Sequence, residues 1–395
     1  MINSQQLILK VLRAFINNRK NITIKNSIDW KKFNRLTEIN SVSGIIGYVL
    51  NQAQNIDCPD KIKQFYTEAY FSTIAITTIR DEAMKSVIEL LSKNGIDHLL
   101  FKGYVVKDLY TVPELRTFGD IDFAIRLEDR AKCNELMQQN GFRLLDDWEP
   151  VYSYEYELEH YEVHTELLDS NLNERMDYKA YFSDFWNHAQ KIDKHTYVLA
   201  PEYHLLYLLM HIAKHLYGSG AGIRMYLDIA FFIKHYREQI DWQHFQGEIE
   251  KLKLSDFVNT VFSAVEEWFA IKSPIALMPK DSAFLDKFTE FTLNGGVFGF
   301  VDKSSVVNQL RKNADERSIN RSTTLLNRTF PPVKHMKARY TYLQTKPWLL
   351  PVAWVHRFFK KKGATVIYIK ESKELLTTNK DEVIELNELY KQIGI

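Results

Sequence analysis

Residues 97–125 read DHLLFKGYVVKDLYTVPELRTFGDIDFAI, the most informative segment of the chain. Residues 121–126 have the composition of a short strand, in which side chains alternate between two faces. The apolar members of this strand can point into a core while Asp120 and Asp122 project together. Paired carboxylates offer the hard oxygen ligands that suit Mg²⁺. The stretch therefore predicts a two-metal phosphoryl-transfer site, with an aspartate pair in an ordinary turn as the alternative interpretation.

The composition is that of an ordinary globular protein of 395 residues, 45% hydrophobic and 13% aromatic, long enough for two or three domains. Lys plus Arg number 51 and Asp plus Glu 50, so the net charge of +1 gives no reason to expect nucleic acid as an obligatory partner. Cys58 and Cys133 have neither metal-ligand spacing nor the number for a disulfide framework, so we expect a cytoplasmic location. Because Lys10 interrupts the first apolar run, we expect neither a signal peptide nor a spanning helix.

The apolar spacing predicts helices on both sides of a sheet region. Residues 4–17 and 59–93 have helical spacing, the latter as more than one helix ending at Asn94-Gly95. Residues 142–168 have the pattern of successive strands, and residues 201–269 that of further helices. An α/β unit followed by strands predicts an α+β fold with an α/β core and a mixed sheet, flanked by helical regions.

Four segments follow from this pattern. We expect an N-terminal helical region over 1–94, a catalytic domain over 95–198, a helical domain that closes a cleft over 199–295, and a basic aromatic extension over 296–395. Within the extension, residues 365–369 resemble a strand and residues 381–392 an amphipathic helix.

The extension differs sharply in composition from the rest. Residues 317–362 hold eleven basic side chains and no Asp or Glu, interleaved with aromatic rings. Residues 330–362 suit contact with an acidic surface or membrane, or a groove that stacks nucleic-acid bases. A packed extension with a solvated lysine cluster is the third interpretation. The membrane contact would use Trp348, Leu349, Leu350 and Trp354.

Several ordered motifs make the chain resemble the uncharacterised nucleotidyltransferase family of the DNA polymerase beta-like superfamily. The similarity extends from about Asp29 to Trp242 and more weakly into the basic extension. The motifs are FKG at 101–103, Tyr110, R-x-x-G-D-I-D at 116–122, NGF at 140–142, VHTE at 163–166, H-x-x-x-H at 211–215, GIR at 222–224 and DIA at 228–230.

The resemblance implies a glycine-containing turn for the nucleotide phosphates, a D-x-D pair for two metal ions and a third acidic residue on a later strand. Carried over, Gly103 is the turn and Asp120 and Asp122 are the pair. Tyr104 stands where many members have Ser or Gly, and fifteen residues separate it from Asp120, a longer gap than usual.

The third metal ligand is expected on a neighbouring strand. Glu162, His164 and Glu166 alternate and share one face of that strand. Glu162 is the predicted catalytic ligand, and His164 could bind metal or substrate, or orient Glu162. An exposed polar strand face is the alternative.

Nucleotide binding is assigned to residues on both sides of the carboxylates. Lys102, Gly103 and Tyr104 precede a predicted helix over 105–110, whose N-terminus favours anions. Arg116 suits a triphosphate as a fork-shaped donor, or a salt bridge that holds the loop. Lys102 could equally be a surface lysine.

A second group of candidates lies in the helical region. His211 and His215 are four residues apart on a predicted helix and face one way, without the glutamate and third ligand of a zinc protease motif. With Arg224 and Asp228 they are expected to line the wall of a nucleotide or acceptor site, unless the histidines belong to an ordinary core.

The sequence thus predicts a Mg²⁺-dependent nucleotidyltransferase, with Mn²⁺ as the alternative ion. It would transfer NMP from an NTP to an acceptor that is a small molecule, glycan, protein or RNA. The alternatives are a catalytically weak nucleotide-binding or scaffold protein, and a participant in surface-glycan assembly peripheral to the membrane.

Overall fold

The computed structural model divides the chain into two compact units, residues 1–216 with 220–299, and residues 217–219 with 300–395. The division into four segments stays a prediction. The structure describes residues 3–19, 22–24, 28–53, 55–173, 175–218, 220–297, 310, 314–315, 318–319, 321–337, 340–360, 375 and 377–395.

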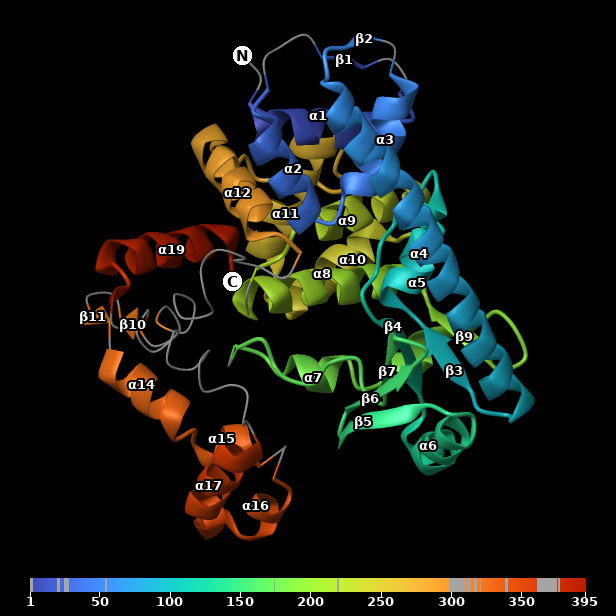
Figure 1. Ribbon diagram of the computed structural model, residues 1–395. Helices are drawn as coiled ribbons and strands as arrows, with labels where there is room; N and C mark the ends of the chain where they lie inside the picture. Colours follow the sequence, from blue (N-terminus) through green and yellow to red (C-terminus); the bar gives the residue numbers. More distant parts are fainter. Residues whose placement is uncertain are drawn as a thin grey trace. The chain divides into compact units, whose positions relative to one another are not determined.

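A mixed seven-stranded sheet forms the centre of the first unit, in the order β5-β6-β7-β4-β3-β9-β8 (Figure 1). β4 is parallel to β7 and antiparallel to β3, which is parallel to β9. The predicted α+β fold with a mixed sheet is confirmed. The strands are β3 His98–Leu100, β4 Ile121–Ile125, β5 Arg143–Trp148, β6 Val151–Tyr156, β7 Glu159–His164, β8 Ala189–Lys191 and β9 Thr196–Leu199.

One face of β4 is buried, as its alternating pattern predicts. Ile121, Phe123 and Ile125 are each at most 1% exposed and pack in one core with residues of α4 (Asp60–Lys93) and α6 (Arg130–Gln139). Complete burial of such side chains contributes about 1.5–3 kcal/mol each. This burial fixes the face of β4, and Asp122 consequently lies on the opposite one.

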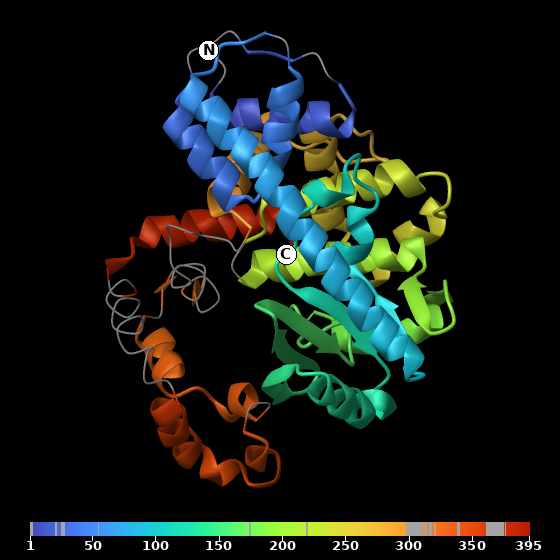
Figure 2. The ribbon, with the colours of Figure 1, turned by 45° about the vertical axis from the view of Figure 1, so that its right-hand side comes forward.

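The helix α4 is a single helix of 34 residues, so the prediction of more than one helix over 59–93 is wrong. Neither Gly nor Pro interrupts it, and its length lets it pack against two different layers. It runs from α3 (Ser43–Gln52) down along the sheet (Figure 2). It ends at Asn94-Gly95 as predicted, where Gly95 has a φ of +65°.

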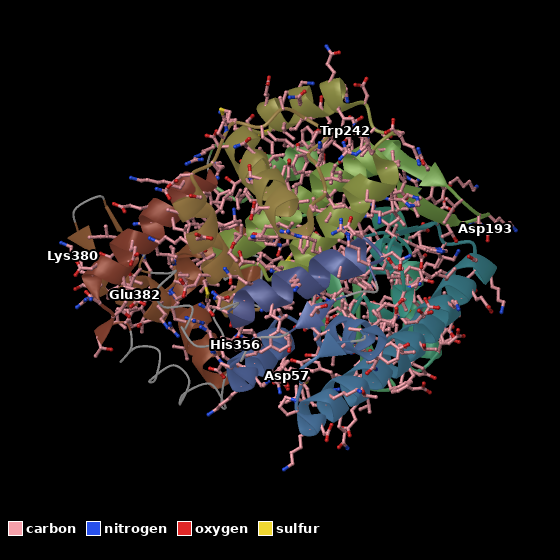
Figure 3. The ribbon with its side chains drawn as sticks, turned by 90° about the horizontal axis from the view of Figure 1, so that it is seen from above. Asp57, Asp193, Trp242, His356, Lys380 and Glu382 are labelled. Atoms are coloured by element: carbon pink, nitrogen blue, oxygen red, sulfur yellow. The ribbon has the colours of Figure 1, made fainter. Side chains whose placement is uncertain are left out.

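Further helices surround α4 and the sheet. The N-terminal α1 (Ser4–Ile16) packs against α11, to which Arg13 donates a hydrogen bond at the Trp268 carbonyl, 3.1 Å away. The other helices of this unit are α2 Trp30–Ile39, α5 Lys102–Lys107, α7 Tyr178–Tyr181, α8 Pro201–Gly218, α9 Ile223–Tyr236, α10 Trp242–Lys251, α11 Ser255–Phe269 and α12 Ser282–Gly295. Seen from above, Trp242 marks the start of α10, and Asp193 projects outward from the turn between β8 and β9 (Figure 3).

The second unit contains short helices with two small apolar clusters. Leu349, Leu350 and Trp354 of the predicted membrane contact pack against one cluster, whereas Trp348 is 72% exposed. Residues 365–369 lie outside the described part, and the predicted terminal helix is confirmed. The helices are α14 Arg321–Thr329, α15 Val333–Met336, α16 Tyr342–Thr345, α17 Leu350–Lys360 and α19 Lys380–Ile393.

Among the residues that the structure describes, none of the helices has the length and apolar character needed to cross a bilayer.

Two glycines give opposite predictions for the packing of α3 and α10. A Cβ on Gly47 would lie 2.0 Å from the Tyr66 carbonyl oxygen, whereas a Cβ on Gly247 would meet no atom within 4 Å. We expect Gly47→Ala to lower the free energy of unfolding by about 1–3 kcal/mol through overpacking. Gly247→Ala should raise it by about 0.5–1 kcal/mol, since alanine restricts the unfolded chain. Urea unfolding of both variants measures this, and equal effects would contradict the close approach of α3 and α4.

Candidate functional site

The parallel pairing of β4 and β7 brings the predicted carboxylates together. Asp122 is opposite Glu162 in the register, and Ala124 is opposite His164. Asp120 directly precedes β4, where His160 of β7 lies beside it. Because alternate residues of a strand share a face, the two strands line up three carboxylates and two imidazoles.

The side chains form two groups that share Glu162. The inner cluster is Asp122, Glu162 and His164, and the outer cluster is Asp120, His160 and Glu162. In each cluster one ligand atom from every residue lies within 4.8 Å of the others. His164 Nε2 is 3.0 Å from Asp122 Oδ1, and His160 Nδ1 is 3.0 Å from Asp120 Oδ1. Carboxylate oxygens with imidazole nitrogens are a donor set that fits a divalent cation.

The charges of this group are only partly balanced. Burial, and then the charges of Glu162 and Asp122, raise the pKa of Asp120. Burial alone would also raise the pKa of Asp122, but the Lys102 charge and the hydrogen bond with His164 lower it overall. Positive charge therefore outweighs burial at Asp122, whereas at Asp120 the effect of His160 is smaller than that of burial and the neighbouring carboxylates. An added cation would relieve the remaining repulsion.

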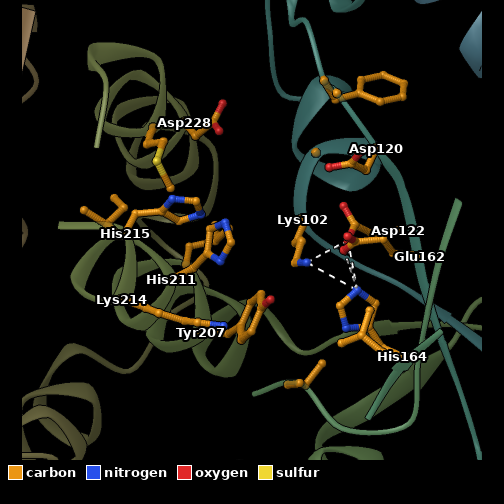
Figure 4. Close-up of a pocket in the computed structure, with 18 of the residues that line it drawn as sticks. Lys102, Asp120, Asp122, Glu162, His164, Tyr207, His211, Lys214, His215 and Asp228 are labelled. Carbon is orange, nitrogen blue, oxygen red and sulfur yellow. Dashed lines mark hydrogen bonds and ion pairs between the residues drawn. The ribbon is translucent and has the colours of Figure 1, made fainter. Parts of the chain in front are cut away.

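Lys102 supplies that positive charge from an unusual backbone position. It has a φ of +52°, and α5 begins at Lys102 itself rather than at 105 as predicted. Its Nζ is 2.7 Å from Asp122 Oδ1 and 3.4 Å from His164 Nε2 (Figure 4). This left-handed conformation is uncommon outside glycine. Here it occurs at the residue whose ammonium points at the inner cluster.

The position of Arg116 requires a glycine at residue 103. A Cβ at this position would lie 2.1 Å from Arg116 Nη1, so the absence of a side chain makes room for a guanidinium. Tyr104 does not line the pocket. Its ring packs against the core of the sheet, with Lys107 Nζ 4.8 Å from its centre. The structure thus places Tyr104 away from the carboxylates with which the sequence grouped it.

Arg116 forms a buried ion pair. Its Nη2 is 2.6 Å from Asp228 Oδ2 and its Nε is 3.2 Å from Oδ1, so the contact is bidentate. Tyr110 donates a third hydrogen bond to Asp228 Oδ1 at 2.7 Å. Of the two interpretations of Arg116, the structure shows the salt bridge that holds the loop. Both Arg116 and Asp228 still line the pocket.

The pocket has a volume of about 620 Å³, which is within the range of small-molecule sites. Its floor is formed by the carboxylates of β4 and β7, and His211 and His215 of α8 face them across the space (Figure 4). Arg224 also lines it, and donates to the Thr117 carbonyl and, at 3.0 Å, to Thr117 Oγ1. All the predicted site residues except Tyr104 are brought together here.

His211 and His215 of α8 have pKa values below the usual range of an imidazole. Burial, followed by the His215 and Lys102 charges, lowers the pKa of His211 well below its usual range. Burial, followed by the charges of Lys102 and Lys214, lowers the pKa of His215 to about 4. The wall therefore offers imidazoles that can accept as well as donate hydrogen bonds.

Sequence reasoning missed several residues that line the pocket, among them His160, Tyr207 and Lys214. His160 extends the alternation of Glu162 and His164 by one step, which was a usable signal. Tyr207 lies four residues before His211 and Lys214 three after it, so helical spacing already placed them near the same face.

The fold and the site define a class of protein. A mixed sheet that presents D-x-D on one strand and an acidic residue on its parallel neighbour is the arrangement implied by the nucleotidyltransferase resemblance. The sequence profile of a family described as uncharacterised nucleotidyltransferases matches residues 26–270. The chain belongs to that family. No protein of curated function matches it.

The buried ion pair predicts a large loss of stability in Asp228→Ala. Removal of one partner leaves the Arg116 charge buried and unpaired, at a cost of about 3–5 kcal/mol in the free energy of unfolding. The double variant Arg116→Met/Asp228→Leu should lose less than the single one. Asp147→Ala is the matched control, because the Arg130–Asp147 pair leaves the carboxylate 63% exposed and should cost under about 1 kcal/mol. Urea unfolding that gave similar losses for Asp228→Ala and Asp147→Ala would contradict the assignment.

His204 of α8 predicts a loss of stability in acid. Burial lowers its pKa to about 3, against an opposing effect of Asp228, so the folded protein keeps it neutral where the unfolded chain protonates it. Its contribution is complete above about pH 6.5 and is lost as pH falls toward about 3. Between about pH 6.5 and about pH 4.5 we expect the free energy of unfolding of wild type to fall by about 3 kcal/mol more than that of His204→Leu. Urea unfolding of both proteins at these two pH values measures the difference. Substitution of the exposed His188 is the control, and equal pH dependence of wild type and His204→Leu would contradict the prediction.

Proposed function

We propose that this protein is a Mg²⁺-dependent nucleotidyltransferase that transfers NMP from an NTP to an acceptor, with Mn²⁺ as an alternative ion. The observation that carries the proposal is the placement of Asp120, Asp122 and Glu162 side by side on the floor of the pocket. Membership of a nucleotidyltransferase family supports the general reaction.

The reaction forms one bond and breaks one. An acceptor oxygen attacks the α-phosphorus of the NTP, the anhydride between the α- and β-phosphates breaks, and pyrophosphate leaves. The hydroxyl proton passes to a carboxylate of the site or to solvent. Divalent ions, when bound, neutralise charge on the leaving phosphates and make the acceptor hydroxyl more acidic. We assign their binding to Asp120, Asp122, Glu162 and His164 in a two-metal arrangement.

The cations of the pocket suit the triphosphate. Lys102, Lys214 and Arg224 line the same space as the carboxylates, so phosphates held there would be adjacent to the ion ligands. Arg116 would act by positioning, since its guanidinium is engaged by Asp228. Gly103 would contribute by admitting that guanidinium. Tyr104 is not assigned to nucleotide binding, because its ring packs against the core of the sheet and does not line the pocket.

The acceptor side of the pocket carries His211, His215 and Asp228. Neutral imidazoles are suited to hydroxyl-bearing acceptors, which include small molecules, glycans, proteins and RNA. A contact of residues 330–362 with a membrane or acidic surface stays a prediction.

A transfer assay tests the proposal. We expect wild type with an α-phosphate-labelled NTP and Mg²⁺ to label an acceptor fraction of a cell extract. Asp120→Asn and Asp122→Asn should lower the rate by at least about 100-fold, the scale of one lost electrostatic contact to a transition state. Asp193→Asn, in the turn between β8 and β9, should leave the rate unchanged. NTP binding by wild type without transfer of label to any fraction would favour the nucleotide-binding or scaffold alternative instead.

A further inference from the structure

The inner and outer clusters differ in charge compensation. The inner carboxylate of Asp122 has the Lys102 ammonium 2.7 Å away, and His164 3.0 Å away. In the part of the chain that the structure describes, neither Asp120 nor Glu162 forms an ion pair with a lysine or arginine. The uncompensated negative charge of the site is therefore concentrated in the outer cluster.

The two clusters also differ in access. Asp122 and His164 are 15% and 5% exposed, whereas Asp120 and His160 are 51% and 37% exposed. An ion entering from solvent meets the outer cluster first. It would lose less hydration there than in the inner cluster, where the Lys102 ammonium would also have to be displaced.

The outer cluster is built on a defined frame. His160 and Glu162 are alternate residues of β7, and Asp120 is held at the start of β4 by the pairing of Ile121 with Tyr161. The His160 Nδ1 and Asp120 Oδ1 atoms face each other at 3.0 Å. Two carboxylates and one imidazole on rigid strands form a mixed oxygen and nitrogen donor set.

We propose that Asp120, His160 and Glu162 form a divalent-cation site that takes the first ion in the absence of nucleotide, while Lys102 neutralises the inner cluster. This assignment rests on the proposed function. It adds His160 as a ligand and gives the order in which the two clusters bind their ions. The inner cluster accepts its ion when a triphosphate draws the Lys102 ammonium away from Asp122. Because imidazole favours transition metals over Mg²⁺, the outer site binds Mn²⁺ more tightly than Mg²⁺.

The test measures Mn²⁺ binding to the full chain without nucleotide. We expect equilibrium dialysis to give one Mn²⁺ per chain for wild type, and pulsed electron paramagnetic resonance to show nitrogen coupling from one imidazole. His160→Ala should weaken binding by about tenfold or more and remove the nitrogen signal. Asp120→Asn should also weaken binding. Lys102→Met should bind two Mn²⁺, since the inner cluster is then free of its ammonium.

His188→Ala removes a histidine that is paired with Asp184 on the surface and should leave Mn²⁺ binding unchanged. Two ions bound by wild type, no ion bound at all, or an unchanged nitrogen signal in His160→Ala would each overturn the proposal. A nitrogen signal lost only in His164→Ala would place the first ion in the inner cluster and overturn it too. None of these measurements involves transfer, so failure of the proposed function leaves them interpretable.

Discussion

The geometry of the site depends on the buried ion pair between Arg116 and Asp228. Arg116 lies in the loop that leads to Asp120 and Asp122, and Asp228 belongs to α9, so the pair ties the ends of β-strands to the helical layer. A bidentate contact fixes the orientation of the guanidinium as well as its distance. It also explains Gly103, whose missing side chain leaves space for Arg116 Nη1. Loop, turn and helix consequently meet at this interaction, and Arg224 of α9 adds hydrogen bonds to Thr117 of the same loop.

The sequence predicted those features of the fold that local periodicity determines. Alternation in β4 predicted which residues are buried, and Asn94-Gly95 predicted the end of α4. It did not predict that α4 is one helix of 34 residues, which is about three times the length of an average helix. Nor could it give the parallel register of β4 with β7, since register depends on contacts between residues about 40 positions apart.

The sequence predicted which residues form the site better than it predicted which of them contact one another. Asp122 and Glu162 were assigned as ligands, and the register places them opposite each other. Arg116 illustrates what was missing. A guanidinium before a D-x-D motif suits a phosphate or a carboxylate equally well, and only the fold shows that Asp228, 112 residues later, lies against it. Tyr104 was assigned from its place in the motif after Gly103, although successive residues of a helix point in different directions.

The electrostatics of the site follow from the pairing of two strands. Parallel register sets three carboxylates on one face, where burial and mutual repulsion raise the pKa of Asp120. One lysine can neutralise only one of them. Lys102, which has a left-handed backbone, places its ammonium against the inner carboxylate of Asp122. The remaining negative charge therefore lies toward solvent, beside an imidazole. Under the proposed function, a site organised in this way would attract cations before it had bound any phosphate. A triphosphate arriving later would then meet both the bound cation and the Lys102 ammonium.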